Sequence, residues 1–130
     1  METKLNQIDA QGHRQGPWER YWNNGNLMSK GSFLDDKRTG YWEEYWHNGK
    51  LWYKGSYLND KRTGFWESYW STGNLIQKGS HLYDKRTGAW EQYYNNGNLQ
   101  YKGSYLNGEK IGTWIEYDRE GNLIEVIYYH

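Results

Sequence analysis

Glutamates that could act as paired catalytic acids recur every 24 residues along this chain, at Glu19, Glu43, Glu67 and Glu91. On alternate strands of one sheet their carboxylates would lie about 10 Å apart, close to the separation found in inverting glycosidases. A lysine is expected between each neighbouring pair, and its positive charge keeps the acids ionised instead of raising the pKa as an acid catalyst requires. The column therefore predicts a ladder of opposite charges and no catalytic pair.

Histidine and cysteine offer little else for catalysis or metal binding. The chain has no cysteine, which excludes a disulfide framework and a thiolate zinc site. Its four histidines occupy unrelated positions of the repeat, so none forms a ligand pair or stands beside a serine nucleophile. We expect surface histidines, no metal, no cofactor and no enzymatic activity. The residues concerned are His13, His47, His81 and His130.

A basic dipeptide also recurs with the 24-residue step and would lie along one rim of a sheet, where it could hold phosphate or anionic lipid headgroups. An aspartate adjoins each dipeptide and reduces the local charge, which favours solvated turns instead. The 16 basic and 16 acidic residues of the whole chain cancel, which argues against binding to nucleic acid. The rim residues are Lys37, Arg38, Lys61, Arg62, Lys85 and Arg86.

Aromatic residues dominate the apolar content, with 9 Trp, 14 Tyr and 2 Phe. Those that differ between repeats are candidates for binding a partner, since a specific partner must recognise what differs. One such column holds tryptophan in three repeats but changes to Tyr94 and Asp118 in the last two. Interface energy concentrates in a few Trp, Tyr and Arg anchors. The candidate partner-binding residues are Trp22, Trp46, Trp52, Tyr53 and Trp70.

All these columns belong to one 24-residue unit, marked by the order Gly-x-Trp-x-x-Tyr, then Gly and Leu. A period of this size predicts stacked units that bury apolar surface against their neighbours. We expect a single domain over residues 1–130, with a partial unit at 12–15 and a last repeat that acts as a cap. The five repeats are 16–39, 40–63, 64–87, 88–111 and 112–130.

Each unit contains two aromatic-rich runs separated by a turn signal such as Asn48-Gly49. Asn-Gly between such runs favours a two-residue type I′ hairpin, because both central residues need positive φ. The second connection, residues 59–64, is expected to form a longer polar turn closing on glycine. The sequence therefore predicts an all-β fold: an elongated, single-layer antiparallel β-meander of about ten strands in five hairpin repeats.

The hairpin register follows from the Asn-Gly turn. A two-residue loop places Glu43 opposite Lys54 and Trp42 opposite Gly55, and the same pairs recur in the other repeats. A ring lying over a strand glycine compensates for the missing side chain. Strand alternation then puts Trp18, Trp22, Leu27 and their repeats on one face. The Glu–Lys ladder lies on the other face.

Units such as residues 54–75, with Lys-Gly-Ser-Tyr-Leu, Gly-Phe-Trp-Glu-Ser-Tyr and Gly-Asn-Leu, resemble MORN repeats. More narrowly, they resemble the variant found in bacterial antitoxin and immunity proteins of the YwqK type. The resemblance covers roughly residues 12 to 127. It implies an elongated single-layer sheet in which each repeat is a hairpin, with a groove that accepts protein or peptide. It implies no catalytic residues.

These observations predict a non-catalytic module that binds another protein, most simply an antitoxin or immunity protein that neutralises a toxin or effector. One alternative is an anionic-lipid or phosphate scaffold that uses the basic rim at a membrane surface. Another is an aromatic repeat module for carbohydrate or choline. The apolar last strand, 123–129, could also pair with itself. A polar start without a signal peptide, and no run of membrane-spanning length, favour the cytoplasm.

Overall fold

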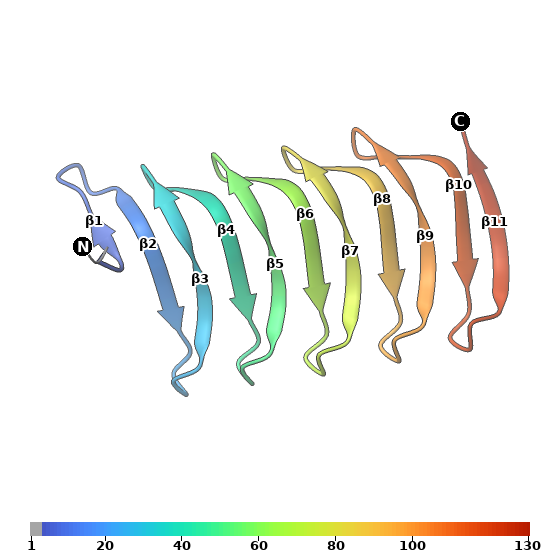
Figure 1. Cartoon of the computed structure of the whole chain (residues 1–130), viewed down its shortest axis with the longest axis horizontal. Coiled ribbons are helices and arrows are strands. Elements are labelled where there is room, and N and C mark those ends of the chain that lie inside the picture. Colours follow the sequence, from blue (N-terminus) through green and yellow to red (C-terminus); the bar gives the residue numbers. More distant parts are fainter. Residues whose placement is uncertain (1–3) are drawn as a thin grey trace.

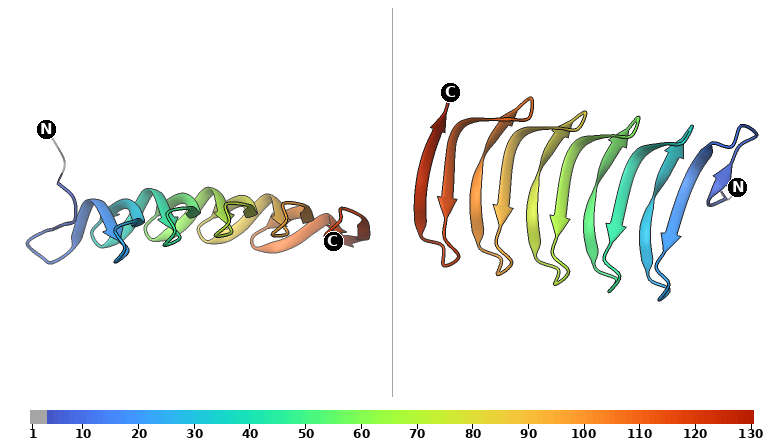
Figure 2. Two further views of the ribbon diagram at one scale, coloured as in Figure 1. Left: turned by 90° about the horizontal axis from the view of Figure 1, so that it is seen from below. Right: turned by 180° about the vertical axis from the view of Figure 1, so that it is seen from behind.

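The computed structural model describes residues 4–130; Met1–Thr3, the start of the predicted domain, lie outside the described part. Eleven strands form one sheet in chain order, and each strand is antiparallel to the next (Figure 1). Seen along its edge, the molecule is long and thin (Figure 2). The predicted all-β, single-layer meander is confirmed. The strands are β1 (Gln7–Ile8), β2 (Arg14–Tyr21), β3 (Leu27–Leu34), β4 (Lys37–Tyr45), β5 (Leu51–Leu58), β6 (Lys61–Tyr69), β7 (Leu75–Leu82), β8 (Lys85–Tyr93), β9 (Leu99–Leu106), β10 (Glu109–Tyr117) and β11 (Leu123–Tyr129).

The two kinds of turn are exchanged relative to the prediction. Leu58 pairs directly with Lys61, and the two residues between them, Asn59 and Asp60, both have positive φ, of 50° and 67°. This is the two-residue type I′ geometry that the sequence assigned to Asn-Gly.

At the Asn-Gly loop itself, only the glycine has positive φ. Gly49 has a φ of 91°, and its N–H donates to the Trp46 carbonyl at 3.0 Å. The Trp46 N–H donates to the Lys50 carbonyl at 2.8 Å, so the loop is a three-residue one: a type I turn followed by a left-handed glycine.

Within residues 4–130, no helix has the length and apolarity needed to cross a membrane.

The predicted register is nevertheless correct in the strands. Glu43 pairs with Lys54 and Trp42 with Gly55, as expected. A β-bulge restores that register, because Tyr45 pairs with Leu51 while Glu44 pairs with Tyr53. Trp52, which lies between Leu51 and Tyr53, therefore has no partner on β4.

This bulge changes the faces. Trp52 and Tyr53 are consecutive, yet their rings touch each other, and they touch Trp46 and Trp66 on the same side of the sheet. Leu51 pairs with Tyr45 and therefore shares its face, the one with the Glu–Lys columns. The expectation that the leucine column of Leu27 lies with the tryptophans was wrong, because the bulge interrupts the alternation.

The tryptophan rings cover glycines, but not those in their own hairpins. A Cβ placed on Gly31 would lie 2.0 Å from Cδ2 of Trp42, and one on Gly55 would lie 2.1 Å from Cδ2 of Trp66. Each ring thus leans onto the preceding strand, away from the glycine with which its residue pairs in its own hairpin. The expected ring–glycine contact exists, and it joins two repeats instead of closing one hairpin.

The core is a single row of rings on this side of the sheet, which we call the Trp face. Nine successive edge-to-face contacts, with centroid separations of 5.0–6.5 Å, run from β2 to β11. Such contacts add to the apolar burial of the rings. We call this row the ring spine. Its members are Trp18, Phe33, Trp42, Tyr57, Trp66, His81, Trp90, Tyr105, Trp114 and Tyr129.

Side-chain hydrogen bonds tie each loop to the next along both rims. The Asn48 amide donates to the Ser71 carbonyl at 2.8 Å, and Asn24 and Asn96 make the same bond to the loops that follow them. At the opposite rim, the Asp60 carboxylate accepts the Arg38 N–H at 2.9 Å. Each repeat therefore fixes the position of its neighbours.

Candidate functional site

A continuous patch of partly exposed rings lies on the Trp face of the second repeat. The rings of Trp46 and Trp52 are 4.6 Å apart between centroids, and those of Trp52 and Tyr53 are 5.0 Å apart. Tyr53 in turn stacks on the spine residue Trp66 at 6.0 Å. Trp52 remains 37% exposed. Three of the five predicted partner-binding residues are thus brought together.

This ring patch borders a hollow of about 400 Å³ on the Trp face. Trp52 and Tyr53 of the ring patch line it, together with the spine residues Trp66, His81 and Trp90. Arg62, which the sequence placed on the basic rim, also lines the hollow. The site therefore combines aromatic surface with a guanidinium group.

His81 corrects the expectation of surface histidines. Its ring is 7% exposed and lies between Trp66 and Trp90, at centroid separations of 6.1 and 5.1 Å. Its Nδ1 is buried without a hydrogen-bond partner. Burial, followed by the positive charges of Arg62 and Arg86, lowers the pKa of His81 to about 4. The imidazole is therefore neutral at pH 7.

Burial also perturbs the acids of this face. It raises the pKa of Tyr53 to about 12, with the charge of Glu44 adding to the effect. Burial raises the pKa of Glu44 as well, against the opposing charges of Arg20 and Arg38. Both shifts have burial as their first cause and follow from the apolar surroundings of the two groups.

Trp22 and Trp46 have a structural role beside any role in binding. The indole N–H of Trp46 donates to the Tyr69 carbonyl at 3.0 Å, and that of Trp22 donates to the Tyr45 carbonyl at 3.2 Å. Tyr94, which replaces tryptophan in this column, donates its hydroxyl to the Tyr117 carbonyl at 2.8 Å. Asp118, at this position of the fifth repeat, instead accepts the backbone N–H groups of Glu120 and Asn122 within its own turn.

The other two candidates are separate from the ring patch. Trp22 lies one repeat earlier, and its ring contacts that of His47 at 6.1 Å between centroids. Trp70 lies one repeat later and is 37% exposed. The five predicted residues therefore form one compact group, Trp46, Trp52 and Tyr53, with Trp22 and Trp70 on either side of it along the sheet.

The arginines of the basic rim lie over rings of the Trp face and do not form an open row of charges along the rim. The Arg38 guanidinium lies 4.1 Å from the Tyr57 ring centroid, and its Nε donates to the Asp60 carboxylate at 2.8 Å. Hydrogen bonds from Arg38 also hold the pKa of Asp60 below its usual range. Arg62 and Arg86 likewise cover rings. The lysines of the rim, Lys37, Lys61 and Lys85, are exposed.

The glutamate column pairs with tyrosine hydroxyls instead of lysines. Tyr45 donates to Glu43 at 3.0 Å, and Tyr69 donates to Glu67. Burial first, and the glutamate second, raise the pKa of Tyr69 to about 12. None of the ion pairs within residues 4–130 joins a glutamate to a lysine. The expected register is present, but the expected salt ladder is not.

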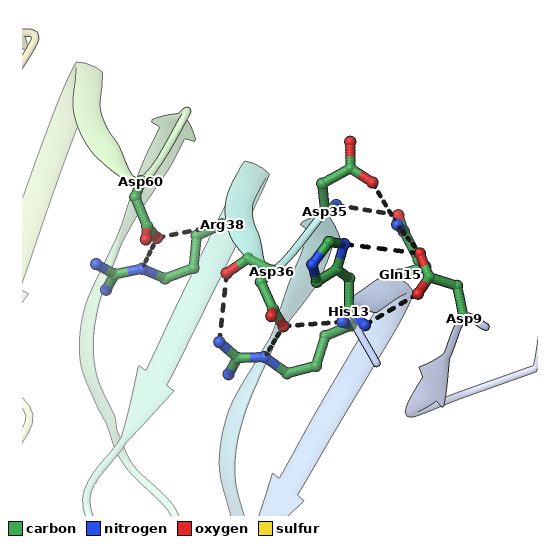
Figure 3. Close-up of polar contacts among 8 residues, drawn as sticks. Asp9, His13, Gln15, Asp35, Asp36, Arg38 and Asp60 are labelled. Atoms are coloured by element: carbon green, nitrogen blue, oxygen red, sulfur yellow. Dashed lines mark hydrogen bonds and ion pairs between the residues drawn. The ribbon is translucent and has the colours of Figure 1, made fainter. Parts of the chain in front are cut away.

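A polar cluster closes the N-terminal end of the sheet (Figure 3). The carboxylates of Asp9 and Asp35 both accept hydrogen bonds from the Gln15 side-chain amide, at 2.9 and 2.6 Å. The His13 imidazole lies 4.0 Å from Asp9. This grouping of His13 with two aspartates has the makeup of a metal site, which the sequence analysis did not anticipate. The Gln15 amide occupies the space between the carboxylates, so the cluster serves as a structural cap.

The sequence analysis did not predict which residues line the hollow beside the ring patch. His81 could have been found as the one residue without a phenyl ring in the column that otherwise holds Phe33, Tyr57, Tyr105 and Tyr129. Arg62 was predicted as part of the basic rim, and Trp66 and Trp90 were predicted as rings that stabilise the fold by covering glycines. That these residues surround one hollow depends on the way each ring leans toward the preceding repeat.

A family model described as a MORN repeat variant matches the chain at residues 14–35, 38–59, 86–107 and 110–130. These stretches cover more than half of the chain and follow the observed repeats. Between the second and third stretches lie residues 60–85, which include Arg62 and His81. No curated protein matches the chain.

Proposed function

Because the chain belongs to the family of MORN repeat variant proteins, we propose that it is a non-catalytic module that binds another protein through the Trp face of its central repeats. The observation that carries the proposal is the exposed ring patch of Trp46, Trp52 and Tyr53 beside the hollow. Partly exposed aromatic groups around a depression are typical of protein-interface anchors.

The size of the surface supports this proposal. Eleven strands at about 4.8 Å each give a sheet about 50 Å long, enough for an interface of standard size. The columns suggested for catalysis have structural partners instead, since the glutamates accept tyrosine hydroxyls. The glutamate column, on the face opposite the Trp face, therefore gives no support to an enzymatic role.

The more specific role that we propose is that of an antitoxin or immunity protein of the YwqK type, which covers a toxin or effector in the cytoplasm. This role rests on the resemblance of the repeat units to such proteins. The lipid or phosphate alternative is less well supported, because Arg38 and the other rim arginines cover rings or pair with aspartate. The carbohydrate or choline alternative requires open ring faces, whereas arginines cover several of them.

The test is co-expression with the product of the adjacent gene, followed by calorimetry with the purified pair. Trp52→Ala should weaken binding by at least about tenfold, the loss expected of an interface anchor. Phe65→Ala is the matched control, because Phe65 is an exposed ring on the opposite face. Equal losses in the two variants, or none in either, would overturn the proposed surface.

A further inference from the structure

The third repeat departs from its neighbours on the Trp face. In the spine column that holds Tyr57 and Tyr105 it has His81, whose ring carries no hydroxyl. Nearby, the indole of Trp66 also breaks the pattern. Trp42 and Trp90 donate their indole N–H to carbonyls of the preceding strand, whereas Trp66 donates to Thr63 of its own strand at 3.3 Å. The hollow of about 400 Å³ lies over this irregular place.

The missing hydroxyl leaves Arg62 without the acceptor that its equivalents use. Arg38 donates to the Tyr57 hydroxyl at 3.0 Å, and Arg86 donates to the Tyr105 hydroxyl at 3.2 Å. Among residues 4–130, the Arg62 guanidinium makes no hydrogen bond and no ion pair. The backbone N–H of Arg62 donates to the Asp84 carboxylate at 2.7 Å, and its carbonyl accepts the Asp84 N–H at 2.9 Å. The guanidinium lies 5.0 Å from the Trp66 centroid and 6.0 Å from that of Tyr53. An exposed guanidinium without an acceptor among the described residues therefore borders an aromatic hollow.

Two arginines place positive charge beside the hollow, and Asp84 opposes their effect on His81 only in part. Arg62 and Arg86 both lie close enough to His81 to lower its pKa. No ion pair within the described residues joins either of them to a carboxylate. Among the residues that line the hollow, Glu67 alone is acidic, and its carboxylate accepts the Tyr69 hydroxyl. The hollow therefore complements a ligand that brings its own negative charge.

We propose that this hollow, the Arg62 site, receives an acidic side chain of the protein partner, an aspartate or glutamate that stands next to an aromatic or aliphatic residue. The carboxylate would accept the guanidinium donors in a bidentate pair, the geometry that suits arginine best. The neighbouring apolar side chain would lie against Trp52 and Trp90. This inference rests on the proposed function and specifies the chemistry of the partner.

The test uses two blocked tetrapeptides, acetyl-Gly-Asp-Phe-Gly-amide and its isosteric Asn counterpart, so that only the charge differs. Binding is followed by NMR through the indole N–H signals of Trp52, Trp66 and Trp90. The Asp peptide should shift these signals with an affinity about tenfold higher than that of the Asn peptide, a typical gain from a charge-assisted pair. Equal affinities would overturn the proposal.

Three variants locate the site. Arg62→Gln should lower the affinity for the Asp peptide to that of the Asn peptide, whereas Lys61→Gln, which removes the same charge from an exposed neighbour, should leave it unchanged. His81→Tyr restores the residue of the other repeats, supplies the missing hydroxyl to Arg62 and narrows the hollow. It should fold normally, as judged by its melting temperature, and bind neither peptide. Unchanged binding in Arg62→Gln or in a folded His81→Tyr variant would overturn the proposal.

Inorganic phosphate distinguishes a peptide site from a general anion site. It should displace the Asp peptide only at an ionic strength at which sodium chloride does so too. Displacement by phosphate at much lower concentrations would overturn the assignment to an acidic side chain.

The same variants separate this inference from the proposed function. Selective peptide binding without any complex with the toxin or effector would contradict the proposed function alone. A complex that Trp52→Ala disrupts and that Arg62→Gln and His81→Tyr leave intact would contradict the Arg62 site alone.

Discussion

The indole ring of Trp66 lies over the backbone of Gly55, although the residue that pairs with Gly55 in its own hairpin is Trp42. A Cβ on Gly55 would be 2.1 Å from the ring. The contact connects two successive hairpins, so the glycine is needed where one repeat joins the next.

Replacing this glycine should therefore destabilise the fold through the ring. Gly55→Ala must displace the buried indole and should cost about 1–3 kcal/mol or more, as overpacking does. Trp66→Ala should cost about 3–5 kcal/mol. In a double variant the alanine at position 55 meets no ring, so its added cost should fall below about 1 kcal/mol. Urea unfolding of the four proteins measures the coupling, and strictly additive costs would contradict the contact.

The two members of a basic dipeptide should differ in their effect on stability. Arg38 pairs with Asp60, donates to the Tyr57 hydroxyl and covers its ring, whereas Lys37 is exposed. Arg38→Gln should therefore cost about 1 kcal/mol or more, and Lys37→Gln less than about 0.5 kcal/mol. Both variants lose one positive charge, so each controls for net charge. Equal unfolding midpoints would show that the contacts of the Arg38 side chain do not stabilise the fold.

Stability should fall in mild acid because of His81. Its pKa is about 4 in the folded chain and about 6.5 when the ring is solvated. Below pH 6.5 the unfolded chain binds a proton that the folded chain does not, so stability decreases as the pH falls from 6.5 to 4, by up to about 3 kcal/mol. His81→Phe, which resembles the spine at Phe33, should lack this decrease. Denaturant titrations at pH 7 and pH 4.5 compare the two, and parallel losses would refute the assignment.

The two ends of the sheet should differ in self-association. The first long strand, β2, is covered by β1 and carries Pro17, whereas β11 has no further strand within the described residues. Val126 on β11 is 56% exposed. Such an apolar edge can pair with a second copy. Sedimentation velocity should detect concentration-dependent association that Val126→Lys suppresses, while partner binding is unchanged. Association that persists in this variant would indicate another contact.

The repeat length, the strand order and the register were predictable, because they depend on the 24-residue period and on residue counts across a turn. Trp42 opposite Gly55 is one example. The turn types were not predicted, because Asn48 has a second function. Its amide binds the Ser71 carbonyl of the next loop, a preference that local turn statistics do not contain. The three-residue loop and the bulge at Trp52 each shift the pairing by one residue, in opposite directions. The predicted register is therefore correct although the predicted turn is not.

The candidate site was predicted in part. Trp46, Trp52 and Tyr53 were chosen as aromatic positions that vary between repeats, and they do lie together. The roles of Arg62 and His81 depend on which strand each side chain leans toward. That direction is set by packing between repeats, and no single hairpin sequence specifies it.

The ring spine is one residue thick, so the buried rings of this molecule form a row and not a central core. Within the spine, each described ring contacts only the ring before it and the ring after it, so a substitution affects the packing of a few strands and little beyond them. His81 shows this independence, since the spine continues on both sides of it. A lineage of such proteins could therefore revise its binding preferences one hairpin at a time, or lengthen by copying a unit, without redesigning the rest.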